Sequence, residues 1–353
     1  MDSFRDQPAA WKMTRIAWVT SARIEVELVD WLYANAEPIL RFRVARDLME
    51  FDSRALHPLC RAAVDTPDAQ RWLENLNAAR AVHGSTDLHA ENALAKLLEF
   101  GLDRSTPEFD AGIRRLLERP WRMWDALVLR CFLLRCGYAD HPFVSAWAKE
   151  RIETLWRTAS SGDFNLYLTD EETGGVPRAW RGKPVYRPQF GHEAGYAIPI
   201  CYDLLAISCL MHVPGVDDLP RKLEAMVGYL SDPRFQETVG GFGWARDLGR
   251  CYAAGRVFLA CAEPNRLILF LEWAAPFAAA RQSDWFQRGL SLLETYRMEV
   301  GFYQFPAGML PEKAGYQVYG GAHMGLGESR RGDLGLRLES TFRMLWIRKR
   351  MGR

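Results

Sequence analysis

Histidines stand at two predicted helix starts, where they could transfer protons. His89 comes just before an apolar helix predicted over Glu91–Phe100, and His192 precedes the most apolar helix, predicted over Tyr196–Met211. Imidazole changes charge near neutral pH, so a histidine directed into an apolar interior is a candidate general acid or base. We therefore predict catalytic roles for His89 and His192. His323, in a glycine- and tyrosine-rich stretch, is predicted to contact a ligand.

One carboxylate lies inside the most apolar helix. Asp203 is the one charged residue in the run predicted to form the Tyr196–Met211 helix. A buried carboxylate must be paired, hydrogen-bonded or protonated, because an isolated charge is costly to remove from water. Two interpretations follow. Asp203 pairs with an inner arginine such as Arg130 or Arg250, or it stays protonated and acts as a catalytic proton donor.

The helix starts are also rich in aromatic residues, and these are predicted to contact the substrate: Trp121, Trp124, Tyr196, Trp244 and Tyr252. Aromatic walls suit isoprenoid or sugar ligands, and aromatic faces stabilise cations. Two of the tryptophans stand near carboxylates, since Trp124 precedes Asp125 and Trp244 comes shortly before Asp247. Acid-initiated carbocation chemistry requires an aromatic ring beside a proton donor, and a sugar site requires the same pair. Asp125 and Asp247 therefore join the predicted catalytic residues.

The elements that must position these residues are helices of two kinds. Some are apolar nearly all round, and they are predicted over Ile39–Met49, Glu91–Phe100, Trp124–Cys136, Tyr196–Met211, Asp247–Ala262 and Leu338–Arg350. The others have one apolar stripe and one charged face, and they are predicted over Pro58–Leu76, Pro107–Glu118, Pro142–Trp156, Leu219–Leu230 and Ser283–Met298. The two kinds alternate along the chain, which indicates buried inner helices and half-exposed outer helices.

Two segments look like copies of one helical hairpin. In each, an inner helix ends at a glycine, Gly101 or Gly137, and the next helix begins soon after at a proline, Pro107 or Pro142. Glycine is favoured just past a helix end, and proline is favoured in the first turn. We predict an all-α fold, an α/α toroid of about five to six such hairpins, with an open superhelix of the same hairpins as the alternative. It is predicted to form a single domain over residues 1–353.

Connector lengths predict which face carries the site. Links from inner to outer helices are short, whereas links from outer to inner helices are long, above all at about 157–191 and 299–337. Long loops in a compact domain are usually functional. All the long ones precede inner helices, so they are predicted to cover the face that carries the inner helices' N-termini. For the glycine-rich residues 315–328 two interpretations stay open, a lid over the cavity and a surface loop without a role.

These patterns resemble the α/α-toroid superfamily of terpenoid cyclases and protein prenyltransferase β-subunits. Gly240-Gly-Phe-Gly-Trp is similar to the superfamily's Gly-Gly-Phe-x repeat element. The opening run from Trp31 and the closing run from Leu338 resemble an uncharacterised bacterial branch of toroid proteins. The resemblance implies a closed barrel of inner and outer helices around a central cavity for an isoprenoid-like molecule.

The chain departs from the chemistry of that superfamily in two ways. The Asp-x-Asp-Asp acid motif of the cyclases and the Gln-Trp repeats are missing from the sequence. The prenyltransferases bind zinc through an Asp-x-Cys pair and a later histidine, whereas here Asp247 and Cys251 are four residues apart and His323 is far downstream. We therefore predict no metal and no cofactor, with zinc on Asp247, Cys251 and His323 as the alternative.

The composition excludes several classes of protein. The 353 residues include 45 Lys+Arg against 44 Asp+Glu, and nucleic-acid binding needs a basic surplus. The seven cysteines form no Cys-x-x-Cys pair and lie mostly in apolar stretches, which is typical of reduced thiols in a cytoplasmic protein. The most apolar window contains a charge and a proline, so no membrane span is predicted.

These features predict a metal-independent acid–base enzyme of the lyase, isomerase or cyclase type. Its substrate is expected to be a small, largely apolar molecule held in the central cavity. Two alternatives stay open, namely a non-catalytic module that binds a ligand or acts as a scaffold, and a carbohydrate-active α/α barrel. The sequence also leaves open whether the protein forms a homo-oligomer.

Overall fold

The computed structural model describes residues 25–190, 197–210, 213–237, 241–245, 250–253, 264–299 and 301–352. Over these residues the fold is all-helical, apart from three isolated bridges and one antiparallel hairpin of strands β1 (Phe242–Ala245) and β2 (Arg250–Ala253). This confirms the predicted all-α class. The same residues contain no helix that is both long and apolar enough to cross a membrane.

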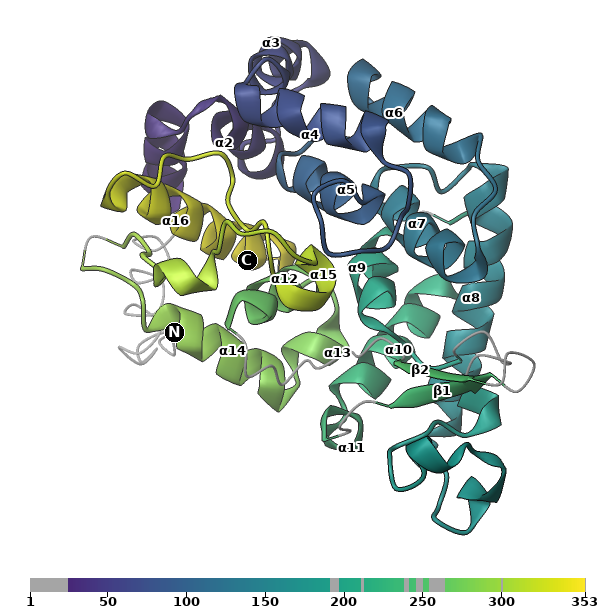
Figure 1. Cartoon of the computed structure of the whole chain (residues 1–353). Helices are drawn as coiled ribbons and strands as arrows, with labels where there is room; N and C mark the ends of the chain where they lie inside the picture. The colour runs from purple at the N-terminus through teal and green to yellow at the C-terminus, as the bar shows by residue number, and fades with distance from the viewer. Residues whose placement is uncertain are drawn as a thin grey trace, which may run out of the picture.

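The helices follow one another along the chain with short turns or irregular segments between them (Figure 1). After helical residues 25–35 come α2 (Pro38–Arg43), the π-helix η1 (Val44–Leu48), α3 (Ser53–Val64), α4 (Pro67–Ala78), α5 (Ala90–Glu99), α6 (Pro107–Leu117), α7 (Met123–Arg135) and α8 (Pro142–Ser161). Three short 3-10 turns follow, η2 (Glu172–Gly175), η3 (Arg178–Trp180) and η4 (Pro188–Phe190). The chain continues with α9 (Cys201–Leu210), α10 (Leu219–Ser231), α11 (Pro233–Gln236), α12 (Pro264–Ala274), α13 (Ala278–Arg281), α14 (Asp284–Glu294), η6 (Ala307–Met309), α15 (Gln317–Gly320) and α16 (Asp333–Arg350).

Buried and half-exposed helices form two layers. Every residue of α5 is buried, whereas α6 buries only one face. The buried helices contact one another in the order α5, α7, α9, α12, α16 and η1. At the end of that series, Arg43 of α2 donates a hydrogen bond to the carbonyl of Glu99 in α5. The outer helices contact one another in two series, α3 with α4 and α6, and α8 with α10, α13 and α14 (Figure 1).

Helix ends follow the predicted glycine and proline signals. Gly101 and Gly137, just past α5 and α7, have positive φ angles of 86° and 91°, a conformation that glycine adopts without a Cβ clash. Pro107 and Pro142 occupy the first turns of α6 and α8, where a missing N–H costs nothing. These turns reverse the chain between the buried layer and the outer layer.

The C-terminal ends of α5 and α12 are joined to α16 by buried ion pairs. Arg343 donates to Glu272 Oε1 at 2.7 Å and to Glu99 Oε2 at 2.9 Å, and its side chain is 1% exposed. Burial acts against the charge of Glu99, but Arg343 and Arg43 hold the pKa of that carboxyl below its ordinary value. Paired charges therefore fill the interior at this end, and a ligand site has to be sought at the opposite, N-terminal end of α5 and α12.

Two predicted helices are wrong in the described part of the chain. The helix predicted over Asp247–Ala262 is contradicted by β2, since Arg250–Ala253 pairs with β1 as a strand. The buried helix of this region is α12, which begins later at Pro264. The outer helix predicted over Pro58–Leu76 is two helices, because Asp65 and Thr66 break it and the Thr66 side chain caps α4.

Candidate functional site

The best-organised polar cluster of the described residues surrounds His83. This histidine lies in the loop between α4 and α5, and its side chain is 29% exposed. Its Nδ1 atom is 2.9 Å from Glu91 Oε1 and 3.1 Å from the Tyr202 hydroxyl. Within the part of the chain that the structure describes, its Nε2 atom has no hydrogen-bond partner. The imidazole is thus held on one nitrogen, and the other is free to meet a ligand.

Glu91 is the carboxylate that orients His83. It is the second residue of α5 and is 2% exposed. Its Oε1 accepts a hydrogen bond from the backbone N–H of Gly84 at 2.6 Å, and its Oε2 accepts one from the Tyr202 hydroxyl at 2.5 Å. Because the Tyr202 hydroxyl gives its one proton to Glu91, His83 Nδ1 must be the donor in its own hydrogen bond with that hydroxyl. This fixes the tautomer in which Nε2 is an acceptor.

Tyr202 remains neutral in this arrangement. Burial, followed by the nearby Glu91 carboxylate, raises the pKa of Tyr202 well above its ordinary value. The phenol therefore keeps its proton and donates it to Glu91. With the Gly84 N–H and His83, it supplies the donors that a buried carboxylate needs.

Three aromatic rings surround the imidazole. Tyr316 stacks on it with ring centroids 5.0 Å apart and a tilt of 32°. Trp124 and Tyr202 meet it edge-on, at 5.7 Å and 6.0 Å. Trp124 and Tyr202 also contact each other edge-on at 6.2 Å. The environment of His83 is therefore apolar and π-rich on several sides, which favours an apolar or cationic guest.

The site is built where three inner helices begin. Glu91, Trp124 and Tyr202 are each the second residue of their helix, α5, α7 and α9. Asp125, the third residue of α7, accepts a hydrogen bond from the backbone N–H of His83 at 3.1 Å. Helix N-termini carry a partial positive charge, which favours the two carboxylates here. The first turns of α5, α7 and α9 therefore meet around His83.

His89, predicted to be catalytic, is placed differently from His83. It is the N-cap residue of α5, and its Nδ1 lies 2.8 Å from the Thr86 hydroxyl. Its ring covers Gly84 so closely that a Cβ on that glycine would stand 2.1 Å from His89 Nε2. His89 therefore packs against its own loop, and its described polar contacts are with Thr86.

Asp203 forms a buried ion pair with an arginine of the outer layer. Arg151 of α8 donates Nε to Oδ1 at 2.8 Å and Nη2 to Oδ2 at 2.6 Å, and the two side chains are 4% and 3% exposed. Asp203 also accepts a hydrogen bond from the Ile200 N–H at the start of α9. The partner is thus Arg151 rather than the predicted Arg130, which packs on Phe143 instead.

Two further predicted residues, Trp121 and His323, make no described contact with His83. Trp121 donates its indole N–H to the carbonyl of Leu116 at 2.8 Å. His323 is 4% exposed, packs edge-on against Trp72, and has its Nε2 3.4 Å from Asp87 Oδ1. Burial lowers the pKa of His323, so this imidazole is neutral at pH 7.

Several predicted residues fall outside the described residues. His192, Tyr196 and Asp247 are among them, and for Trp244, Tyr252 and Cys251 the structure describes the backbone alone, in β1 and β2. The zinc alternative needs Asp247 and Cys251 together on the predicted helix Asp247–Ala262, and the strand at Cys251 removes that premise. Over the described ranges, no group of three His, Cys, Asp or Glu side chains is placed to hold a metal ion.

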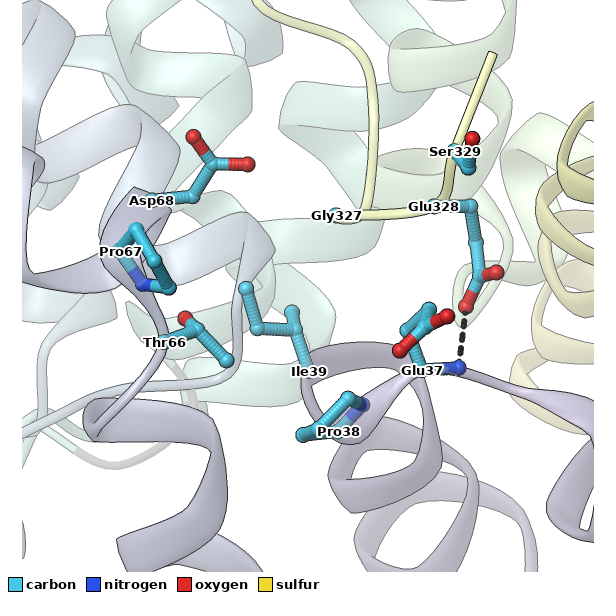
Figure 2. A pocket seen from close by; sticks show the side chains of 9 residues that line it. All are labelled: Glu37, Pro38, Ile39, Thr66, Pro67, Asp68, Gly327, Glu328 and Ser329. Atoms are coloured by element: carbon cyan, nitrogen blue, oxygen red, sulfur yellow. Dashed lines mark hydrogen bonds between the residues drawn. The ribbon is translucent and has the colours of Figure 1, made fainter. Parts of the chain in front are cut away.

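A separate surface pocket of about 360 Å³ lies between the start of α2, the start of α4 and residues 327–329. Glu37, Asp68 and Glu328 contribute carboxylates to its lining. Figure 2 shows the Glu328 carboxyl directed to the backbone N–H of Glu37, which donates to it at 2.8 Å. Burial raises the pKa of Glu328 to about 7. The lining holds no imidazole, thiol or aromatic ring, so His83 marks the stronger candidate site.

The prediction missed the two central residues, although Trp124 and Asp125 of the predicted set do join the site. A glutamate in the first turn of a helix is common, because it suits the helix dipole, so Glu91 attracted no special role. The available signal was that a glutamate in a helix predicted to be buried needs hydrogen-bond partners. Comparisons of the chain with protein-family models, with curated proteins and with solved structures give no match.

Proposed function

We propose that the chain is an acid–base enzyme in which His83 transfers the proton. The observation that supports this most strongly is the setting of the imidazole, with Nδ1 hydrogen-bonded to Tyr202 and 2.9 Å from the buried Glu91 carboxylate, and with Nε2 left for a ligand. A carboxylate placed this way orients the ring and stabilises the imidazolium that forms when Nε2 takes up a proton. Glu91 is then the positioning residue, and His83 is the catalytic residue.

The surroundings favour a small, largely apolar substrate. Trp124, Tyr202 and Tyr316 present aromatic rings around His83. Leu88 and Tyr319, which belong to the two segments that meet at the site, are 57% and 37% exposed. Aromatic faces also stabilise positive charge that develops on carbon. A lyase, isomerase or cyclase that acts on an unsaturated or isoprenoid-like molecule uses these features best.

We propose further that the two helical layers close into an α/α toroid. The contact series from α5 through α7, α9, α12 and α16 to η1 supports a closed inner layer, as does the bond from Arg43 to the end of α5. In that arrangement His83 stands at the mouth of the barrel, and the ion pairs of Arg343 close its other end. Membership of the terpenoid cyclase-like superfamily is proposed on this architecture alone.

A deuterium-incorporation experiment tests the function even while the substrate is unidentified. Purified protein is incubated in D2O with a mixture of isoprenoid alcohols, allylic alcohols and the corresponding alkenes, and the products are analysed by gas chromatography and mass spectrometry. Isomerisation and cyclisation that begin with protonation of a carbon place a solvent deuteron on that carbon, and so does hydration of an alkene, the reverse of elimination. Hydroxyl hydrogens exchange without an enzyme, so only carbon-bound deuterium is counted. We expect deuterated product from the wild type.

The matched control is the second histidine of the same loop. His83→Asn removes the proposed catalytic nitrogen, whereas His89→Asn alters a side chain whose described polar contacts are with Thr86. We expect His83→Asn to abolish incorporation and His89→Asn to keep it. Equal incorporation in wild type and His83→Asn contradicts the proposal. Retention of a ligand without any incorporation supports the non-catalytic binding module instead.

The carbohydrate alternative has less support in the described geometry. A glycosidase needs two carboxyl groups that face the sugar. Both oxygens of Glu91 are engaged by Gly84, His83 and Tyr202. Asp125 therefore stands as the one carboxylate of the cluster with an oxygen to offer.

A further inference from the structure

The segment after Leu310 crosses the His83 site and returns to its starting point. Its outgoing limb carries Glu312, α15 lies at its tip, and its return limb runs through Gly325. The two limbs are joined where Met324 N–H donates to the carbonyl of Pro311 at 2.9 Å. A compact surface segment whose ends meet in this way is an Ω-loop, a class of loop that is often functional. We call residues 313–322 the cap and residues 311–312 with 324–325 its neck.

A buried lysine closes the neck. Lys96 of α5 is 2% exposed, and it donates to Glu312 Oε1 at 2.8 Å and to the carbonyl of Gly325 at 2.7 Å. Glu312 in turn accepts a hydrogen bond from the Gly325 N–H. Burial acts to raise the pKa of Glu312, but the Lys96 ammonium holds that pKa below its ordinary value. A buried ammonium needs acceptors, and both limbs of the neck supply them.

The cap is exposed along part of its length. Lys313, Ala314 and Tyr319 are exposed, whereas Gln317 and Val318 of α15 and residues 321–326 are buried. The cap is closed internally by the bonds from Gly321 N–H to Gln317 and from Ala322 N–H to Tyr316. Gly315 and Gly321, at either end of α15, have φ angles of 143° and 64°, which only glycine adopts readily. The tip is bounded by two glycines and stands on a fixed neck, so the tip can move as a unit.

Tyr316 connects the cap to the site. It is the N-cap residue of α15, and its ring lies against the imidazole of His83. α15 also contacts α12 as well as α5 and α9, the helices whose first turns carry Glu91 and Tyr202 (Figure 1). A displacement of the cap therefore uncovers the imidazole directly, and a ligand at His83 meets Tyr316 as the movable wall.

We infer that residues 313–322 are a lid over His83, that Tyr316 is the side chain this lid presents to the substrate, and that Lys96 is a positioning residue which fixes its neck. This inference rests on the proposed function of His83. Apolar substrates profit from such a lid, because it excludes water from the proton transfer. Lys96 sits about one and a half turns along α5 from Glu91, so one rigid helix positions both the catalytic histidine and its lid.

The test measures lid opening rather than turnover. Diethyl pyrocarbonate modification of His83 is followed by peptide mass spectrometry, and hydrogen exchange is followed over residues 311–326 and over α10. Lys96→Met removes the clamp of the neck, and Tyr316→Ala removes the ring that covers His83 while leaving every contact of Lys96 in place. Lys222→Met is the control, since the Lys222 side chain is only 11% exposed and also forms an ion pair, with Glu153 on the outer layer.

We expect Lys96→Met to accelerate both His83 modification and exchange at residues 311–326 severalfold, with α10 unchanged. Tyr316→Ala should accelerate His83 modification alone, and Lys222→Met should change neither. The inference is overturned if Tyr316→Ala leaves His83 modification at the wild-type rate. It is also overturned if Lys96→Met, where it folds, raises exchange over α10 as much as over residues 311–326. Neither readout needs catalysis, so a protein without activity can still have the lid, and an active protein can lack it.

Discussion

Removal of Arg151 is expected to destabilise the protein strongly, because it leaves a buried charge without a partner. Arg151 and Asp203 form a two-bond ion pair at 2.6 and 2.8 Å, and neither side chain is more than 4% exposed. In an Arg151→Met variant the Asp203 carboxylate keeps the Ile200 N–H as its described donor. Breaking a buried ion pair in this way costs about 3–5 kcal/mol, most of it from the unpaired charge.

A matched surface substitution provides the scale. Arg114 pairs with Asp110 at 2.7 Å on α6, but its side chain is 74% exposed. Exposed pairs of this kind contribute about 0.3–0.5 kcal/mol, so Arg114→Met should lie close to the wild type. The free energy of unfolding is measured by urea titration followed by circular dichroism, with all variants at one pH and salt concentration.

A double variant separates the unpaired charge from lost packing. Asp203→Asn keeps an oxygen for the Ile200 N–H but removes the charge, so it should restore part of the stability lost in Arg151→Met. The two substitutions are then non-additive, as expected for residues in contact. The reasoning is refuted if Arg151→Met costs no more than Arg114→Met, or if Asp203→Asn in the Arg151→Met background brings no recovery. Such a result would return Asp203 to the candidate proton donors.

Three further measurements test the structure elsewhere. Burial raises the pKa of Glu328 to about 7, against 4.5 for an ordinary glutamate. The unfolded chain therefore loses this proton at lower pH than the folded protein, so the free energy of unfolding falls as pH rises from about 5 to 7. Glu328→Gln should remove that fall, which amounts to at most about 3 kcal/mol. Gly137→Ala should lower the free energy of unfolding by about 1–2 kcal/mol because of its positive φ alone, since the nearest atom to the new Cβ is 3.7 Å away. Gly101→Ala should lower it further in the same assay, because its Cβ would stand 2.6 Å from Arg43 Cδ. Iodoacetamide should leave Cys131, Cys136 and Cys201 unmodified in the folded protein, because all three thiols are buried and burial raises the pKa of each. Early modification of any of them, detected by peptide mass spectrometry, would contradict the packing around these thiols.

Helix ends could be predicted from the sequence because they depend on local chemistry. Pro107 and Pro142 begin α6 and α8, and Gly101 and Gly137 stand just past the ends of α5 and α7. Both preferences involve only the neighbouring turn. The apolar pattern likewise indicates which helices are buried. The helix predicted at Asp247–Ala262 failed because β2 is formed by pairing with β1, and pairing between strands is a contact that composition within one segment does not encode.

The site was predicted only in part, for a related reason. Trp124 and Asp125 were recognised because they stand at a helix start with an aromatic ring beside a carboxylate. The choice of His83 over His89 depends on how the loop before α5 folds back onto Glu91. Two histidines of one loop have no periodic pattern that would distinguish them. Likewise, nothing in the sequence of α9 identifies Arg151 of α8 as the partner of Asp203.

The tautomer of His83 tests the central claim most directly. Nitrogen-15 labelling of histidine, followed by two-bond proton–nitrogen correlation at a pH where the ring is neutral, reports which ring nitrogen carries the proton, and His83→Asn assigns the signal. The structure predicts that Nδ1 carries the proton and that Nε2 is the acceptor, with Glu91→Gln disturbing this preference. A His83 ring protonated on Nε2 in the wild type would contradict the arrangement on which the proposed catalysis depends.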